Sequence, residues 1–271
     1  GLGLAGCSGN KEPESTGSDA GSAKSSSKKA VELQVFAANS LEKALPEVQE
    51  LYTDQTGTTF ADTQFKASGD LVEQMKAGAA VDVLITASKG TMDDAETTEL
   101  VDTDTREDMF VNDLVIIRAE GSDTKVEAIA DVANLDGKIA IGDAKTVPAG
   151  KYANQALASV GLYTGTEGDD GEYAPEIADK VALADKVGTA AAYVSTGDCV
   201  AGFVYSSDIF RYDGIEEAFV CPEDSHKPIM YPGAVAESSE HADEAKAFID
   251  FCLTNKKAQK IWAKYGFELS A

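Results

Sequence analysis

The sequence contains few of the residues from which most metal and redox sites are built. There are two histidines and four cysteines among 271 residues, and no two cysteines form a C-x-x-C pair. Zinc ribbons and thioredoxin-like redox motifs both depend on that pair. No run of eighteen or more apolar residues occurs, which excludes a membrane-spanning helix. The composition therefore indicates neither a resident metal nor a cofactor.

Basic residues are also scarce. The chain has 23 lysines and arginines against 47 aspartates and glutamates, a net charge of −24. Such a body repels nucleic acid and anionic membrane surfaces, so neither is expected as a partner. With 43% hydrophobic residues, the chain still has enough apolar material for a substantial core.

The cysteines leave one question open. Cys199 and Cys221 flank a predicted pair of strands, and in an exported protein they could form a disulfide. They could equally remain two separate buried thiols, since a disulfide requires a specific geometry that spacing does not reveal. The sequence does not assign a role to Cys252.

The first residues indicate export. Leu4-Ala5-Gly6-Cys7 resembles the bacterial lipobox, whose cysteine carries the lipid, so residues 1–7 are expected to be the remnant of a signal peptide. Residues 8–30 have almost no bulky apolar side chain and are expected to form a disordered tether. These features predict a protein anchored at Cys7 on the outer face of the cytoplasmic membrane.

From residue 31 onward, strand and helix patterns alternate, which is typical of an α/β fold with largely parallel sheets. Strands are predicted at 33–36, 57–60, 81–85, 114–118, 138–141, 201–205, 218–221 and 230–236. Helices are predicted at 41–52, 68–78, 151–159, 188–195, 243–254 and 256–264. A late return of the chain to its first half predicts two lobes, with residues 31–111 and 229–271 in lobe 1 and residues 112–228 in lobe 2.

Small or hydroxyl residues precede several predicted helices. They occur in four turns, Asn39-Ser40-Leu41, Ala67-Ser68-Gly69, Pro148-Ala149-Gly150 and Lys186-Val187-Gly188. A helix N-terminus presents unpaired N–H groups and a partial positive charge, which suit an anion. Taken singly, a serine in such a turn is usually only a helix cap, and Ser40 and Ser68 are predicted to be caps. If the turns converge on one crevice, they would form an anion site.

Six segments in the same order resemble the molybdate-binding proteins of ABC transporters. They are Val35–Leu41, Ala77–Ile85, Val147–Ala153, Gly202–Asp208, Pro222–His226 and Lys264–Phe267. The resemblance implies the two-lobed type II periplasmic-binding-protein fold, in which each lobe is a mixed sheet flanked by helices and two strands form the hinge. It also implies a monomer that captures molybdate or tungstate, without catalysis, and passes it to a membrane permease.

The resemblance further implies which residues bind the anion. Ser40 and Ser68 would donate through main-chain N–H and hydroxyl groups, Ala149 and Val187 through main-chain N–H, and Tyr205 through its phenol. All of these groups are hydrogen-bond donors, which suits a fully deprotonated dianion, and the cleft is expected to present no carboxylate to it.

Two other functions remain open from the sequence. The same fold could bind a different anion, such as sulfate. Ser225 and His226 stand side by side and could indicate a secreted hydrolase, although no nucleophile elbow G-x-S-x-G occurs.

Overall fold

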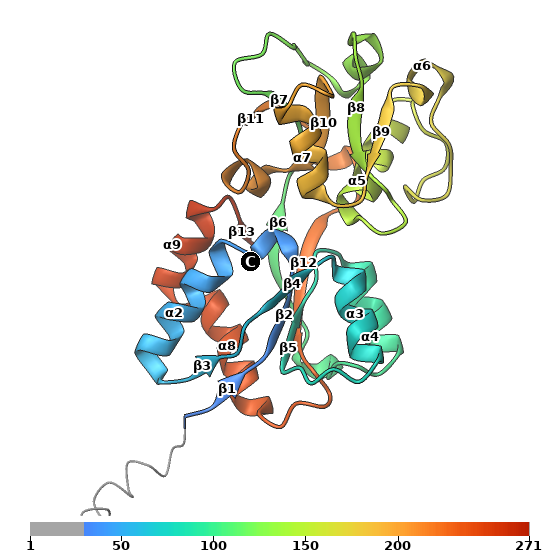
Figure 1. Cartoon of the computed structure of the whole chain (residues 1–271). Helices are drawn as coiled ribbons and strands as arrows, with labels where there is room; N and C mark the ends of the chain where they lie inside the picture. Colours follow the sequence, from blue (N-terminus) through green and yellow to red (C-terminus); the bar gives the residue numbers. More distant parts are fainter. Residues whose placement is uncertain (1–29, 271) are drawn as a thin grey trace, which may run out of the picture.

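Two α/β lobes, one above the other in Figure 1, make up the protein. The computed structural model describes residues 30–270, so the predicted lipobox with Cys7 and nearly all of the predicted tether lie outside the described residues. The predicted two-lobed α/β fold is confirmed. No helix in residues 30–270 has the length and apolar character needed to cross a membrane.

Lobe 1 is built on a mixed sheet of six strands. These are β2 (Val35–Ala38), β4 (Gln64–Lys66), β5 (Val83–Ile85), β6 (Glu107–Asn112), β12 (Ile229–Val235) and β13 (Glu268–Leu269). In space the order is β13-β6-β12-β5-β2-β4, in which β2 is parallel to β4 and β5 whereas β12 is antiparallel to β5 and β6. A short parallel pair, β1 (Glu32–Leu33) and β3 (Thr59–Phe60), extends this lobe.

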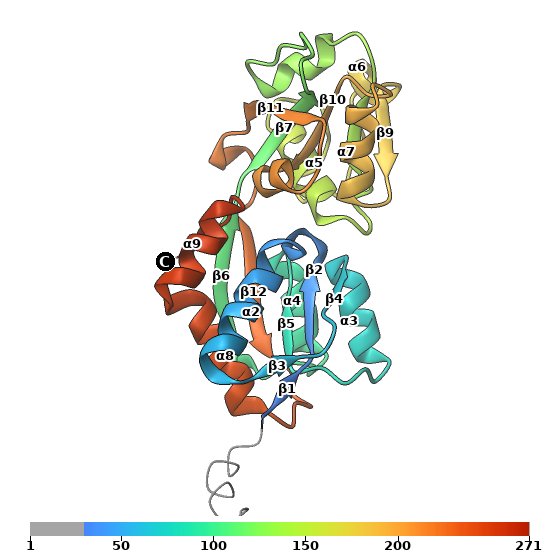
Figure 2. The ribbon, with the colours of Figure 1, turned by 60° about the vertical axis from the view of Figure 1, so that its left-hand side comes forward.

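Helices cover both faces of this sheet (Figure 2). The helical segments are η1 (Asn39–Leu41), α2 (Ala44–Thr56), α3 (Ser68–Lys76), α4 (Lys89–Thr97), η2 (Thr103–Thr105), α8 (Ala242–Thr254) and α9 (Lys256–Lys264). Helices α2, α8 and α9 pack together on one face, and α3 and α4 pack together on the other. Helix α2 shows why: Leu45, Val48 and Tyr52 recur on one side and are buried, and Gly57, with φ of +83°, ends the helix.

Lobe 2 has a five-stranded sheet and its own helices. The elements are β7 (Leu114–Ala119), η3 (Ile129–Asn134), β8 (Ile139–Gly142), α5 (Pro148–Ala158), α6 (Pro175–Ala178), β9 (Val181–Ala184), α7 (Val187–Ser195), β10 (Ala201–Tyr205), η4 (Ser206–Phe210), β11 (Ile215–Val220) and η5 (Glu223–Ser225). The strand order is β11-β7-β10-β8-β9, with β8, β9 and β10 parallel and β7 antiparallel to both of its neighbours. Parallel strands point their carboxyl ends to one edge of the sheet, which here is the edge that faces lobe 1.

Two strands connect the lobes. Strand β6 ends at Asn112 and β7 begins at Leu114, so the first crossing is at Asp113. The second crossing enters β12 at Ile229 after the short helix η5, and β6 and β12 are antiparallel neighbours. Figure 2 shows the two strands running side by side toward the upper lobe, which is the predicted two-strand hinge. The lobe boundaries proposed at residues 111 and 228 stay a prediction.

The prediction that Ser40 and Ser68 cap helices is wrong. The caps are Ala38 for η1 and Ala67 for α3, and neither helix has a side-chain cap hydrogen bond. Each serine lies instead inside the first turn of its helix. The two hydroxyl groups are consequently available for other contacts.

The disulfide considered for Cys199 and Cys221 does not form, and both are free buried thiols. The sheet register explains this. Cys221 donates its N–H to the carbonyl of Leu114, which pairs with Tyr205 at the end of β10, whereas Cys199 lies before the start of β10. The cysteines are therefore separated along the sheet by about six residues of strand, or roughly 20 Å, too far for a bond. Cys252 is also a free buried thiol.

Candidate functional site

A cleft of about 840 Å³ lies between the lobes, and residues of both lobes line it. All five residues that the resemblance singled out are among them: Ser40 and Ser68 from lobe 1, and Ala149, Val187 and Tyr205 from lobe 2. These residues are far apart in the sequence, yet the fold brings them to a single cavity. Their role in binding a ligand is a proposal.

Ser68 opens helix α3 and is almost completely buried, with 1% of its surface exposed. Its Oγ accepts a hydrogen bond of 2.9 Å from the backbone N–H of Ala87, which follows strand β5 in lobe 1. A backbone N–H can only donate, so this contact uses a lone pair of the hydroxyl and leaves its proton unused. Ser68 therefore keeps a donor for the cleft.

Ser40 lies in η1 at the carboxyl end of β2 and is also buried. Its Oγ is 2.7 Å from Oη of Tyr231, a residue of β12. Because both groups are hydroxyls, the distance alone does not say which one donates. Either arrangement fixes the position of the serine oxygen.

Ala149 and Val187 stand at the first turns of two helices. Ala149 is the second residue of α5, and Val187 is the first residue of α7. N–H groups in a first turn have no partner within their helix and carry the positive end of the helix dipole. Gly150 lets α5 begin so close to β8, because a Cβ atom at that position would lie 1.8 Å from the carbonyl oxygen of Gly142.

Tyr205 ends strand β10, and only 3% of its surface is exposed. Within residues 30–270, its buried Oη has no hydrogen-bond partner. Burial raises the pKa of this phenol well above 10, and the neighbouring Tyr231, Tyr152 and Asp208 raise it further. Tyr205 is thus a protonated donor without an acceptor, which is costly in a protein interior unless a ligand supplies one.

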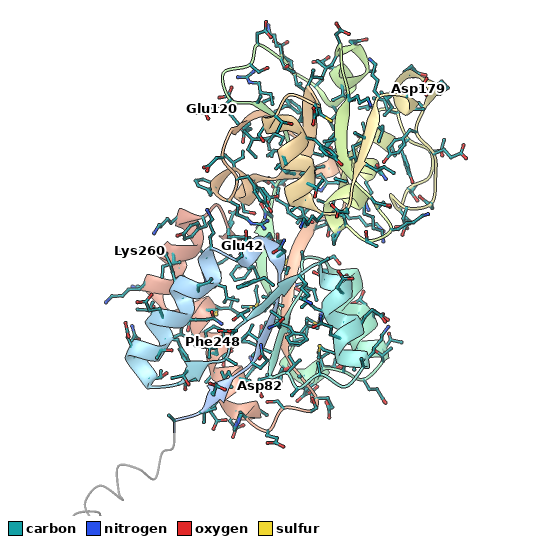
Figure 3. The ribbon with its side chains drawn as sticks, in the orientation of Figure 1. Glu42, Asp82, Glu120, Asp179, Phe248 and Lys260 are labelled. Carbon is teal, nitrogen blue, oxygen red and sulfur yellow. The ribbon has the colours of Figure 1, made fainter. Side chains whose placement is uncertain are left out.

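A buried ion-pair network contacts the backbone of Tyr205. The N–H of Tyr205 donates to Oδ2 of Asp208 at 2.9 Å, and Arg211 donates to Oδ1 of Asp208 at 2.7 Å. Burial raises the pKa of Asp208, and Arg211 opposes this shift. Arg211 also contacts Oε1 of Glu42 at 3.1 Å. Glu42 belongs to lobe 1 and is labelled in Figure 3 near the boundary between the lobes, so this pair links the two lobes beside the cleft.

The expectation that the cleft presents no carboxylate is wrong. Glu42, Asp70 and Asp185 line it, as do Lys66 and Lys186. Glu42 is paired with Arg211, and Asp185 accepts a hydrogen bond of 2.6 Å from the hydroxyl of Thr189. The resemblance concerns only five positions and therefore does not reveal these charges, although Lys66 and Lys186 stand within two residues of Ser68 and Val187.

The profile of the family described as bacterial extracellular solute-binding protein matches residues 33–268. The chain belongs to this family. It is accordingly a solute-binding protein and not an enzyme, and its site of action lies outside the cytoplasm. Membership also implies a membrane permease as the partner that receives the solute.

Several relatives of this solute-binding protein are known by function or structure. The molybdate-binding protein ModA of Escherichia coli (strain K12) is 33% identical over 242 residues, which are 88% of this chain and 89% of the relative. A putative ABC transporter substrate-binding lipoprotein of Bacillus subtilis (strain 168), YvgL, is 29% identical over 97% of this chain and 92% of its own length. The solved substrate-binding domain of a putative molybdenum ABC transporter from Clostridium difficile is 33% identical, with a TM-score of 0.70, and covers 88% of this chain and 99% of that structure.

Ser225 and His226 do not form a catalytic pair in the solute-binding protein. The hydroxyl of Ser225 donates to the carbonyl oxygen of Pro222 at 2.6 Å, and Nδ1 of His226 is 2.7 Å from the carbonyl oxygen of Lys227. The hydroxyl of Ser225 is therefore committed to a backbone carbonyl and not to the imidazole of His226, whose Nε2 is buried with no partner in residues 30–270. The geometry agrees with the family in giving no support to the hydrolase hypothesis.

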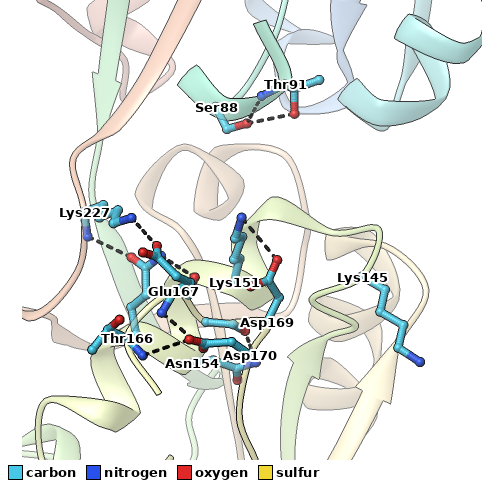
Figure 4. A network of polar contacts seen from close by, with 12 residues as sticks. Ser88, Thr91, Lys145, Lys151, Asn154, Thr166, Glu167, Asp169, Asp170 and Lys227 are labelled. Atoms are coloured by element: carbon cyan, nitrogen blue, oxygen red, sulfur yellow. Dashed lines mark hydrogen bonds and ion pairs between the residues drawn. The ribbon is translucent and has the colours of Figure 1, made fainter. Parts of the chain in front are cut away.

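A second hollow of about 740 Å³ lies between α4 of lobe 1 and α5 of lobe 2. Figure 4 shows Ser88 and Thr91 on one side and a cluster of ion pairs on the other. Lys151 pairs with Asp169 at 3.3 Å, and Lys227 pairs with Glu167. These two lysines already have carboxylate partners, whereas Lys89 and Lys145 also line the hollow.

Proposed function

We propose that this protein captures molybdate or tungstate for an ABC transporter. In this proposal the anion lies in the cleft between the lobes. It accepts hydrogen bonds from the N–H and hydroxyl groups of Ser40 and Ser68, from the N–H groups of Ala149 and Val187, and from the phenol of Tyr205. Both lobes hold the same ligand, so its binding favours the closed arrangement.

One observation carries most of this proposal: the phenol of Tyr205 is buried, protonated and without an acceptor in residues 30–270. An oxyanion in the cleft would supply that acceptor. Ser68 lines the same cavity, and its hydroxyl proton is unused because its Oγ accepts from the N–H of Ala87. The names of the E. coli and C. difficile relatives point to a molybdenum oxyanion.

The donors account for the type of anion. Molybdate, tungstate and sulfate are fully deprotonated near neutral pH, so they only accept hydrogen bonds. Hydrogen phosphate retains a proton and would need an acceptor. The five positions are proposed as donors, so only the carboxylates that also line the cleft, Glu42, Asp70 and Asp185, could accept that proton. A hydrogen bond to a charged group contributes about 1.5–3 kcal/mol. The acidic surface acts weakly at a distance because salt screens it beyond roughly 8 Å.

Thermal melting with a panel of anions tests this function. Molybdate and tungstate at millimolar concentration should raise the melting temperature most, because a ligand that binds only the folded state stabilises it by about 4 kcal/mol at roughly a thousand times its dissociation constant. Phosphate at the same ionic strength is the control and should have little effect. If neither metal oxyanion shifts the melting temperature, the proposed function is wrong.

Sulfate is the second candidate ligand, since it has the same charge and also only accepts hydrogen bonds. It is smaller than molybdate, because S–O bonds are shorter than Mo–O bonds, so the size of the closed cavity decides between them. A larger melting shift with sulfate than with molybdate would favour a sulfate receptor on the same fold.

We also propose that the mature protein is a monomer held to the membrane by a lipid on Cys7. The support is the lipobox-like sequence Leu4-Ala5-Gly6-Cys7 together with the lipoprotein relative from B. subtilis, whose match covers 97% of this chain. A Cys7→Ser variant, expressed in a host that exports the native protein, should lose the lipid mass and move from the membrane fraction to the soluble fraction. Retention in the membrane fraction would contradict the anchor.

A further inference from the structure

A buried chain of hydrogen bonds leads from the hinge to Ser40. Nδ2 of Asn112, the last residue of β6, is 3.3 Å from Oη of Tyr231. The same Oη is 2.7 Å from Oγ of Ser40. All three side chains are buried. The resemblance implies no role for Asn112 or Tyr231, and neither residue lines the cleft.

The orientation of the Asn112 amide follows from its other contacts. Its Oδ1 accepts a hydrogen bond of 3.0 Å from the backbone N–H of Asp113 and one of 3.4 Å from the backbone N–H of Ser207. Backbone N–H groups can only donate, so the atom they contact must be the oxygen. The remaining side-chain atom is the NH₂ group, which donates to Oη of Tyr231 and to Oγ of Ser207 at 2.8 Å.

This orientation of the amide decides which group donates and which accepts in each hydrogen bond from Asn112 to Ser40. A phenol has a single proton, and burial raises the pKa of Tyr231 so that the proton is retained. Oη of Tyr231 accepts from Asn112, so its proton is directed to its other neighbour, Oγ of Ser40. If Ser40 donated instead, the Tyr231 proton would meet the NH₂ group of Asn112. Ser40 therefore accepts, and its own proton is left for the cleft.

We propose that Asn112 and Tyr231 are positioning residues that fix Ser40 as a hydrogen-bond donor toward the bound anion. The inference rests on the proposed function, because it assigns a purpose to the free proton of Ser40. Asn112 also contacts Ser206 and Ser207, the two residues that follow Tyr205. One asparagine at the hinge thus contacts the segment that follows Tyr205 in lobe 2 and is linked through Tyr231 to Ser40 in lobe 1.

Whether one substitution weakens or tightens molybdate binding shows which hydroxyl, that of Tyr231 or that of Ser40, donates. Tyr231→Phe removes the donor to Ser40 and leaves the serine hydroxyl free to rotate, so the dissociation constant of molybdate should rise by about threefold to tenfold. If Ser40 donated to Tyr231 in the native protein, the same variant would release the serine proton and tighten binding. Tyr173→Phe is the matched control, because that tyrosine hydroxyl bonds to Asn154 at 2.7 Å and neither residue lines the cleft. The control should leave the dissociation constant unchanged.

A double-mutant cycle separates positioning from support of the fold. In Asn112→Asp the new carboxylate can only accept from Tyr231, which then accepts from Ser40, so the serine proton is turned away from the anion. The added charge itself weakens binding equally with and without the Tyr231→Phe substitution, and the cycle removes that contribution. We expect Asn112→Asp to weaken binding about tenfold more in the native background than in the Tyr231→Phe background. Equal weakening in both backgrounds would overturn the proposal.

Asn154→Asp controls for the placement of a carboxylate in the protein interior. Asn154 is as well buried as Asn112 and also bonds to a tyrosine, but it does not line the cleft. Figure 4 shows it beside the loop that carries Asp169 and Asp170. This variant should lower the melting temperature without changing the dissociation constant. A loss of affinity equal to that of Asn112→Asp would attribute the effect to general destabilisation and would contradict the proposal.

A measurement without ligand keeps the inference distinct from the proposed function. In the ¹H–¹⁵N correlation spectrum of the ligand-free protein, Tyr231→Phe should shift the signal of one of the two side-chain amide protons of Asn112. The signal of the proton bonded to Ser207 should keep its position. If neither proton moves, Asn112 does not donate to Tyr231 and the inference is wrong. If the expected shift occurs but the native protein binds no oxyanion, the proposed function fails and the hydrogen-bond chain remains.

Discussion

The two lobes hold the groups proposed to bind the anion in different ways. In lobe 1 the proposed donors belong to Ser40 and Ser68, and each serine oxygen already has a protein partner, Tyr231 or the N–H of Ala87. In lobe 2 the phenol of Tyr205 has no partner within residues 30–270, and the N–H groups of Ala149 and Val187 stand at helix starts. Lobe 1 therefore holds its hydroxyl groups in place before a ligand arrives, whereas lobe 2 leaves its hydroxyl unsatisfied.

This difference has an energetic consequence. A bonded hydroxyl contributes to the stability of the empty protein, while a buried hydroxyl without a partner lowers it. A ligand that satisfies Tyr205 removes a cost that the empty protein carries. The order of binding expected from this contrast is that the anion first meets the prepared serines of lobe 1, and that lobe 2 closes afterwards because its donors gain an acceptor.

The largest expected effect comes from placing a charge among the prepared donors of lobe 1. Ser68→Asp sets a carboxylate against a dianion at a distance of a few ångströms. Each pair of unit charges repels by about 4 kcal/mol at roughly 4 Å and an effective dielectric constant of about 20, so affinity should fall by at least about a thousandfold. Calorimetric titration with molybdate measures it. Ser68→Ala, which removes only one donor, should lose much less, and retained affinity in Ser68→Asp would show that Ser68 does not contact the anion.

A second pair of substitutions tests the contrast between the hydroxyl groups directly. Tyr205→Phe should weaken molybdate binding by about 1–3 kcal/mol and at the same time stabilise the empty protein by roughly 1 kcal/mol, since it removes an unsatisfied group. Ser40→Ala should weaken binding similarly but destabilise the empty protein, because it leaves the proton of Tyr231 without an acceptor. Melting of both variants without ligand checks the opposite signs. If both variants changed the stability of the empty protein in the same direction, the proposed difference between the lobes would be wrong.

A smaller effect is expected from two glycines in the helix turns of the site. In lobe 2, Gly150→Ala forces a Cβ atom against the backbone of Gly142 and should destabilise the protein by about 1–3 kcal/mol, because the start of α5 must move. In lobe 1, Gly69 likewise follows a proposed donor, Ser68, in the first turn of α3, and a Cβ atom there meets nothing within 4 Å. Gly69→Ala should be neutral or stabilising by up to about 1 kcal/mol. Chemical denaturation of both variants measures the difference, and similar losses would show that the turn in lobe 1 is equally constrained.

The sequence predicted the fold largely because periodic apolar residues mark the buried elements. Strands such as β8 and β10 are buried at every residue and were predicted almost to their ends. The strand β9 was missed because it lies at the sheet edge and is only partly buried. Helix α4 was missed because its sequence, KGTMDDAET, buries only Met92 and Ala95, although Ser88 caps it and accepts from the N–H of Thr91.

Prediction of the site depended on turns rather than on periodicity. The turns around Ser40, Ser68, Ala149 and Val187 were recognised because each precedes a helix, but their convergence in one cleft came from the resemblance alone. The partners of the serines could not be predicted. Tyr231 lies 191 residues from Ser40, and Ala87 contacts Ser68 through a backbone N–H that carries no mark in the sequence. Long-range contacts of this kind follow from strand register, which a single sequence does not fix.

The smallest expected effect is that the affinity for the anion does not change with pH. This prediction tests whether the phenol of lobe 2 is buried and unsatisfied in the empty protein. The donor form of Tyr205 is the protonated phenol, and burial holds its pKa well above 10. The pKa of Tyr212, which also lines the cleft, is raised to about 12, chiefly by burial. Affinity for tungstate should therefore stay constant from about pH 8 to about pH 10, where an ordinary phenol would already be half ionised. A fall in affinity with a midpoint near about pH 10, absent in Tyr205→Phe, would mean that the phenol is solvated in the empty protein, and lobe 2 would then carry no unsatisfied donor for the anion to complete.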